Sequence, residues 1–115
     1  MAFERHFIHS KVSWRCRLPK RERDPREVHW IVSWAYATRR AQSIEAAKVI
    51  LLDAVDNHRK AAIIHYNLAC YECQLGDLEA AKKYLDVAFR LDKKYRIRAL
   101  DDEDLMALWL MLEEE

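Results

Sequence analysis

Glycine and proline are scarce in this 115-residue chain, which contains one glycine and two prolines. A β-sandwich, a β-barrel or a glycine-rich phosphate-binding loop needs more turn-forming residues. Three cysteines, Cys16, Cys70 and Cys73, cannot form a closed set of disulfides, so we expect a reducing, cytoplasmic location. The longest apolar run, residues 105–112, is too short to cross a bilayer, and residues 1–18 show no signal-peptide pattern. We therefore expect no membrane partner.

Hydrophobic residues make up 51% of the chain and charged residues 34%, which is typical of one small folded domain rather than a disordered chain. The formal net charge is only +1, but the charge is unevenly distributed. Residues 1–27 contain eight Lys or Arg against four acids, whereas residues 101–115 contain seven acids and no Lys or Arg. This asymmetry could steer a partner or hold copies head to tail; two solvated chain ends are the simpler interpretation.

An internal repeat is the strongest pattern in the sequence. The segment IEAAK at residue 44 recurs as LEAAK at residue 78, a spacing of 34. The same spacing relates three further pairs of alanines or leucines: Ala35 and Ala69, Leu51 and Leu85, Ala54 and Ala88. We expect the small residues, including Ala47 and Ala81, to lie where helices approach closely. We expect larger side chains to fill the layers between helices, namely Leu68, Leu75, Leu78, Leu85 and Leu91.

Capping signals divide the repeat into helices. Asp24, Pro25 and Glu27 predict a helix start, and that helix runs to about residue 40. Ser43 caps a second helix to about residue 57, and a third spans about residues 59–74. Gly76 ends the third helix and Asp77 caps a fourth, which runs to about residue 91. A last helix covers about residues 104–113, with Asp101 or Asp102 as its cap.

The stretch YNLACY at residues 66–71, followed by LGD at residues 75–77 and by Ala81 and Ala88, resembles the tetratricopeptide repeat (TPR) family. An upstream copy is similar, with Trp34 and Gln42 replacing the usual Leu and Gly. The resemblance implies an all-α fold, a right-handed superhelix segment of about five helices over residues 25–113. Its repeats would be residues 28–61 and 62–95, closed by a terminal helix at 102–113. We expect residues 1–24 to be a basic arm that is either disordered, as chain ends often are, or extended, since residues 11–18 alternate like a strand.

In this family the first helix of each repeat lines a concave groove that receives a peptide or helix of a partner protein. The register places twelve residues in that groove: His29, Val32, Ser33, Tyr36, Arg39, Arg40, Ile63, Tyr66, Asn67, Cys70, Cys73 and Gln74. Arginine suits a carboxylate, an Asn amide can bond a peptide backbone, and tyrosine offers amphipathic contact area. The Lys and Asn clamp of chaperone-binding members is not matched, because Val32 and Tyr36 stand there.

The predicted terminal helix has more apolar residues than closing the repeat requires. Leu105, Leu108, Trp109 and Leu112 would cover the second repeat. A terminal unit needs a polar outer face for solubility. We therefore expect an association surface on this helix, comprising Met106, Trp109, Leu110 and Met111, unless the N-terminal segment folds over it.

Chemistry-bearing motifs are weak. Cys70 and Cys73 form a C-x-x-C pair, but in the second half of a helix the dipole disfavours a thiolate. The five His are scattered, and no catalytic constellation is recognisable, so we expect no metal, no cofactor and no enzymatic activity. Arg and Lys near Trp14 allow weak nucleic-acid binding, although a solvated linker explains them better. We expect a non-catalytic protein-interaction module; self-association through the terminal helix and arm is the alternative.

Overall fold

The computed structural model of the chain describes residues 25–113, and every secondary-structure element in this part is a helix, joined to the next by a turn. The all-α prediction is confirmed, with six α-helices and one 3₁₀ helix in the described range. No helix there is both long and apolar enough to cross a membrane. In chain order the elements are α2 (Pro25–Ala41), α3 (Ile44–Val55), α4 (Ala62–Gln74), α5 (Leu78–Leu91), α6 (Lys94–Leu100), η2 (Glu103–Leu105) and α7 (Met106–Glu113).

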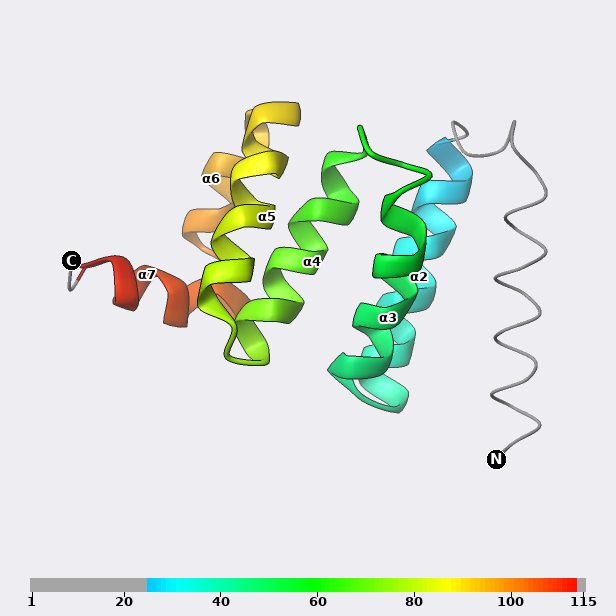
Figure 1. Ribbon diagram of the computed structural model, residues 1–115, viewed down its shortest axis with the longest axis horizontal. Coiled ribbons are helices and arrows are strands. Elements are labelled where there is room, and N and C mark those ends of the chain that lie inside the picture. Colours follow the sequence, from blue (N-terminus) through cyan, green and yellow to red (C-terminus); the bar gives the residue numbers. More distant parts are fainter. Residues whose placement is uncertain (1–24, 114–115) are drawn as a thin grey trace.

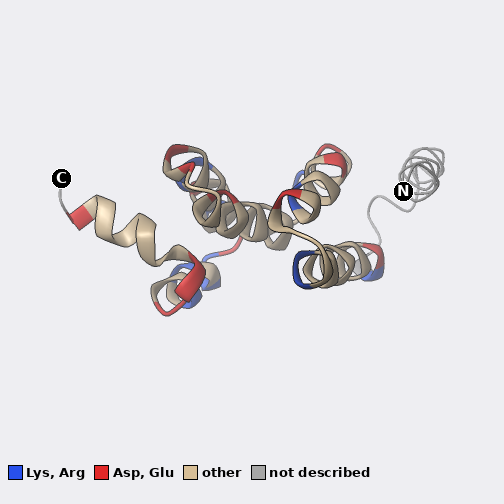
Figure 2. Cartoon of the chain, turned by 90° about the horizontal axis from the view of Figure 1, so that it is seen from below, with Lys and Arg blue, Asp and Glu red and all other residues tan. Residues whose placement is uncertain are grey.

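The helices form two antiparallel hairpins (Figure 1). The elements α6, η2 and α7, residues 94–113, follow them and are called the C-terminal extension. α2 pairs with α3, and α4 pairs with α5. Helices α2 and α6 lie on one side of the molecule, α3 and α5 lie on the other, and α4 is central (Figure 2). An ion pair joins the hairpins, with Lys48 Nζ of α3 3.0 Å from Glu72 Oε1 of α4.

The predicted helix boundaries at the two hairpin turns are confirmed. Ser43 Oγ accepts a hydrogen bond from the Ala46 amide at 3.0 Å, and Asp77 Oδ1 accepts one from the Ala80 amide at 3.1 Å. Gly76 has φ +94°, the left-handed conformation that ends α4. The amide of Asp77 then reaches back to the Glu72 carbonyl at 2.9 Å. Short turns of this kind bring consecutive helices into antiparallel contact.

Small residues at the 34-residue spacing are fully buried. Six alanines predicted at close helix contacts have no exposed surface: Ala35, Ala47, Ala54, Ala69, Ala81 and Ala88. Leu51 and Leu68 are likewise buried completely, and Leu85 almost so. A methyl group at each contact lets the helix backbones approach, and the leucines fill the remaining volume.

Four details of the sequence prediction are wrong. The third helix begins at Ala62, not near residue 59, because residues 58–61 form a turn in which the Ala61 amide donates to the His58 carbonyl. Leu91 is 39% exposed, since it ends α5 beyond the last buried position, Ala88. Helix α6 was not predicted at all, and the terminal helix is divided into η2 and α7.

The C-terminal extension packs firmly on the second hairpin. Leu105 and Leu108 are completely buried, while Trp109 and Leu112 pack partly buried against the core, as predicted. The Trp109 indole Nε1 donates a hydrogen bond to the Ala99 carbonyl at 2.9 Å, which ties α7 to α6. Asp102 caps η2 through Oδ1, which accepts from the Asp104 amide at 3.0 Å. The extension is therefore held against α4 and α5 of the second hairpin.

Candidate functional site

A cavity of about 600 Å³ lies between α2, α4 and the C-terminal extension, and we call it the α2–α4 groove. Nine of the twelve predicted groove residues line it: Val32, Ser33, Tyr36, Arg39, Arg40, Ile63, Tyr66, Asn67 and Cys70. Ala37, Arg98, Asp102 and Asp104 complete the lining. The groove residues from α2 and α4 thus share one concavity, as the register predicts. Its ligand remains a prediction.

The floor of the groove is buried beneath the C-terminal extension. Tyr66 and Cys70 are each 3% exposed, and the Tyr66 hydroxyl donates a 2.6 Å hydrogen bond to Asp102 Oδ2. The Tyr66 ring packs on Tyr95 of α6, with centroids 4.9 Å apart. Burial and the adjacent carboxylate together raise the pKa of Tyr66 well above its usual range. Tyr66 is therefore a neutral hydrogen-bond donor that anchors the extension.

An ion pair between Arg39, near the C-terminal end of α2, and Asp104 of η2 closes one end of the groove. Arg39 Nη1 and Nη2 donate to the two carboxylate oxygens of Asp104 at 2.7 and 2.9 Å. Both side chains are largely shielded, with 22% and 26% exposed. The hydrogen bond to Asp104 raises the pKa of Arg39 further. The Gln74 Nε2 donates to the Asp104 backbone carbonyl at 3.1 Å. Arg39 and Gln74, predicted to hold a partner, instead hold the chain's own acidic segment.

Two other predicted groove residues, Asn67 and Cys73, are not fully available to a partner. One amide hydrogen of Asn67 is used within α4, where Nδ2 donates to the Ile63 carbonyl at 2.8 Å. Cys73 is 4% exposed and lies under η2 and α7. The predicted terminal helix covers this end of α4, and it thereby buries Cys73, which was expected to line the groove.

The open lips of the groove come from α2 and α6. Tyr36 on α2 is 50% exposed and Ile97 on α6 is 74% exposed. Both line an adjoining cavity of about 830 Å³, the mouth, which shares Tyr36, Arg40 and Arg98 with the groove. Arg40 lies over the Tyr36 ring at 6.0 Å from its centroid, and Arg98 lies over the Tyr66 ring at 5.6 Å. Ile97 and Arg98 are missing from the sequence prediction because α6 was missed. The spacing of Tyr95 and Ala99, both buried, was the available signal.

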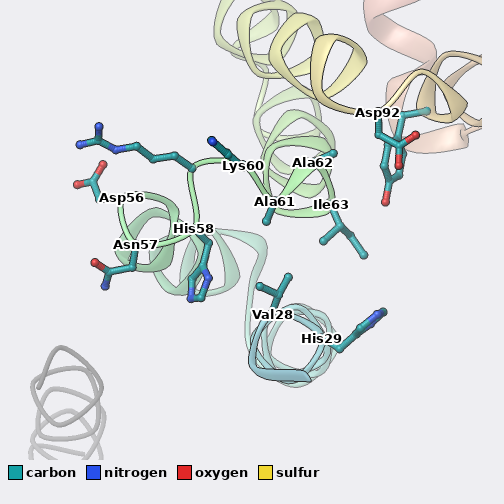
Figure 3. Close-up of a pocket in the computed structure, with 12 residues that line it drawn as sticks. Val28, His29, Asp56, Asn57, His58, Lys60, Ala61, Ala62, Ile63 and Asp92 are labelled. Carbon is teal, nitrogen blue, oxygen red and sulfur yellow. The ribbon is translucent and has the colours of Figure 1, made fainter. Parts of the chain in front are cut away.

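His29 lines a second cavity, of about 580 Å³, that adjoins the groove at Ile63 (Figure 3). Val28 and His29 of α2 lie across this cavity from Ala62 and Ile63 at the start of α4. Nearby, the buried His58 Nε2 lies 3.0 Å from Glu27 Oε2 and ties the α3–α4 turn to α2. The second cavity extends the concave surface along α2.

The C-x-x-C pair lies in the second half of α4, as predicted. Burial raises the pKa of the Cys70 thiol strongly, and the negative charge of Asp102 adds to the effect; burial also raises the pKa of Cys73. Within residues 25–113, Cys70 Sγ, Asp102 and Asp104 offer three ligand atoms within 4.8 Å of one another, a set that could hold a metal ion. Asp104 is paired with Arg39 and Asp102 with Tyr66, so both carboxylates already have partners.

The predicted association surface on α7 is reduced to two exposed residues. Met106 is 54% and Leu110 55% exposed, whereas Trp109 and Met111 are partly buried against the core. The ribbon of α7 is uncharged up to Glu113 (Figure 2). The strand pattern, the basic run and the predicted nucleic-acid contacts of residues 1–24 lie outside the described residues.

Comparison of the chain with models of known protein families finds no match, and neither does comparison with curated proteins or with solved structures. The α2–α4 groove and the adjoining cavity are therefore interpreted from their own geometry and chemistry.

Proposed function

We propose that the chain is a non-catalytic protein-interaction module of the TPR type, whose α2–α4 groove receives a helix or extended segment of a partner protein. One observation supports this above all: nine residues chosen from the 34-residue register line a single cavity. The proposed occupant would contact Tyr36 and Ile97 at the lips and Val32 and Ile63 inside.

The lips supply the main binding energy in this proposal. Tyrosine combines a large apolar surface with a hydroxyl and loses little conformational entropy on binding, so it commonly anchors interfaces. The half-exposed Tyr36 and the exposed Ile97 are free to bury surface against an occupant without disturbing the core. The rigid hairpins would present this surface with little rearrangement.

The test is selection of binders from a random peptide display library on the wild-type chain. Peptides that bind are measured against the double variant Tyr36→Ala, Ile97→Ala. Val49→Ala, Leu52→Ala is the control, because both residues are exposed on α3, on the other side of the molecule. We expect the groove variant to weaken binding at least about tenfold, as for a central anchor residue, and the control to leave it unchanged. Equal loss in both variants, or no peptide selected, would refute the proposal.

Self-association is a second candidate, favoured by the exposed Met106 and Leu110 on the uncharged α7. Size-exclusion chromatography with light scattering tests it. If α7 mediates assembly, the wild-type chain runs as a dimer or larger species, and Met106→Glu, Leu110→Glu runs as a monomer. A wild-type chain that remains monomeric at high concentration excludes this candidate.

A further inference from the structure

One side of helix α4 is buried where the two hairpins meet. Ile64, Leu68 and Tyr71 are three or four positions apart, so they share this side of the helix, and all three are completely buried. The Arg39 guanidinium of α2 lies 5.6 Å from the centroid of the Tyr71 ring, which shows that this side faces the first hairpin. Large apolar residues at these positions are therefore suited to contact with a preceding hairpin.

The 34-residue spacing relates Ile64 and Leu68 to Trp30 and Trp34 of α2, and we call this side of α2 its outer face. Trp30 is 46% exposed and Trp34 is partly buried, and their ring centroids are 5.3 Å apart. Within residues 25–113 no hairpin precedes α2, so the place that α2 and α3 take against α4 is not filled by a described hairpin (Figure 1). A terminal repeat needs a polar outer face, whereas this one carries two tryptophans.

We propose that residues 1–24 of the same chain dock on the outer face of α2 and end the array of hairpins. The segment joins α2 directly at Pro25, so its local concentration at this face is far above that of a separate chain. Helix α2 is about 25 Å long, and a segment of this length spans it either as a helix or as an extended chain. Neither tryptophan of the outer face lines the α2–α4 groove, so the proposal is independent of the proposed function.

The composition of residues 1–24 suits this face. The segment contains six aromatic or branched aliphatic residues: Phe3, Phe7, Ile8, Val12, Trp14 and Leu18. It also contains seven Lys or Arg against three acids. Helix α3 lies beside α2 and carries the acids Glu45 and Asp53, while its one lysine, Lys48, is paired with an acid of α4. An apolar, basic segment therefore matches an aromatic face beside an acidic helix.

Paramagnetic broadening of NMR signals in the full chain tests this contact. The two cysteines of α4 are buried, so a nitroxide label is attached at Cys16, within the segment. The readout is the indole N–H signal of each tryptophan, assigned by replacing one tryptophan at a time with phenylalanine. We expect the label to remove the signals of Trp30 and Trp34. It should leave the signal of Trp109, which lies in α7 at the opposite end of the molecule from α2 (Figure 1).

Two variants labelled in the same way show whether apolar side chains hold the segment in place. Trp14→Ser, Leu18→Ser should restore the signals of Trp30 and Trp34, because the connection at Pro25 remains but the apolar contact is lost. Trp14→Phe, Leu18→Met is the matched control and should keep the loss of signal, because both side chains remain apolar. Circular dichroism establishes that both variants keep their helix content.

Three results would overturn the proposal. The first is that the signals of Trp30 and Trp34 remain in the labelled wild-type chain. The second is equal loss in the wild-type chain and both variants, which indicates only that the label is tethered near α2. The third is loss of these signals in a mixture of nitroxide-labelled chains without the NMR isotope and isotope-labelled chains without the nitroxide, which would assign the face to a second copy. None of these results affects the proposed function of the groove.

Discussion

Breaking the pair of Arg39 and Asp104 should destabilise the fold, because this contact fixes the C-terminal extension to α2. It consists of two hydrogen bonds, of 2.7 and 2.9 Å, between side chains that are 22% and 26% exposed. Hydrogen bonds to charged groups contribute about 1.5–3 kcal/mol net, and fully exposed ion pairs about 0.2–1 kcal/mol. Partial exposure of this pair places the expected coupling energy between these limits, at about 1–2 kcal/mol.

The measurement is a double-mutant cycle with Arg39→Gln, Asp104→Asn and both together, followed by urea unfolding and circular dichroism. The cycle removes other effects of each substitution, including loss of the Arg39 guanidinium from the Tyr71 ring at 5.6 Å. With an m-value of about 1–2 kcal/mol/M for a chain of this size, the coupling corresponds to about 0.5–2 M in urea midpoint.

Lys94 and Asp92 provide an internal control. Their charged atoms are 3.6 Å apart, and their side chains are 73% and 38% exposed. The same cycle with Lys94→Gln and Asp92→Asn should give a coupling energy below about 0.5 kcal/mol. If the cycle at Arg39 and Asp104 gives no more coupling than this control, the pair does not hold the extension, and our account of the groove wall is wrong.

Three further predictions concern the core, a turn and pH. Ala81→Leu should cost about 1–3 kcal/mol in unfolding free energy through overpacking, since Ala81 is fully buried, whereas the exposed Ala107→Leu should stay within about 0.5 kcal/mol; urea unfolding compares them. Gly76→Ala should cost about 1–2 kcal/mol, because φ is +94° although nothing lies within 4 Å of the added methyl group; thermal melts of this variant and of Gln42→Ala, a turn residue without positive φ, test this cause. Burial raises the pKa of Tyr71 to about 12, so its neutral form is favoured in the folded state; its contribution is complete below the unfolded pKa of about 10 and is lost as the pH rises to about 12. Between about pH 10 and about pH 12 the urea midpoint of the wild-type chain should therefore fall more steeply than that of Tyr71→Phe, and equal slopes would contradict this.

The hairpins could be predicted from the sequence because their signals are local or periodic. Ser43, Gly76 and Asp77 act on the few residues beside them, and their chemistry is independent of the rest of the fold. The buried alanines repeat at a fixed spacing, and each must fit the same close contact between helices. The side of α2 and α4 expected to form the groove came from the resemblance to the TPR family, and the spacing only related equivalent positions of the two helices.

Helix α6 and the closure of the groove were not predictable in the same way. The segment 94–100 has no side-chain cap, and its apolar pattern is weak because five of its seven residues are exposed: Lys94, Arg96, Ile97, Arg98 and Leu100. The bonds of Asp102 and Asp104 connect residues 36 and 65 positions apart. No local signal specifies such partners. The sequence predicts Asp101 or Asp102 as a helix cap and the acidic end as solvated, and Asp102 does cap η2. The bonds of Asp102 to Tyr66 and of Asp104 to Arg39 had no signal in the sequence.

Because Asp104 and Arg39 are separated by 65 residues, the two sides of the groove come together late in folding. Helical hairpins form rapidly from neighbouring residues, whereas a contact between distant segments must overcome a larger loop-closure entropy. On a ribosome, α2 to α5 emerge before residues 102–104 do. During that interval Tyr66 and Cys70 have no cover, so the nascent chain exposes an aromatic and thiol surface that the finished protein conceals.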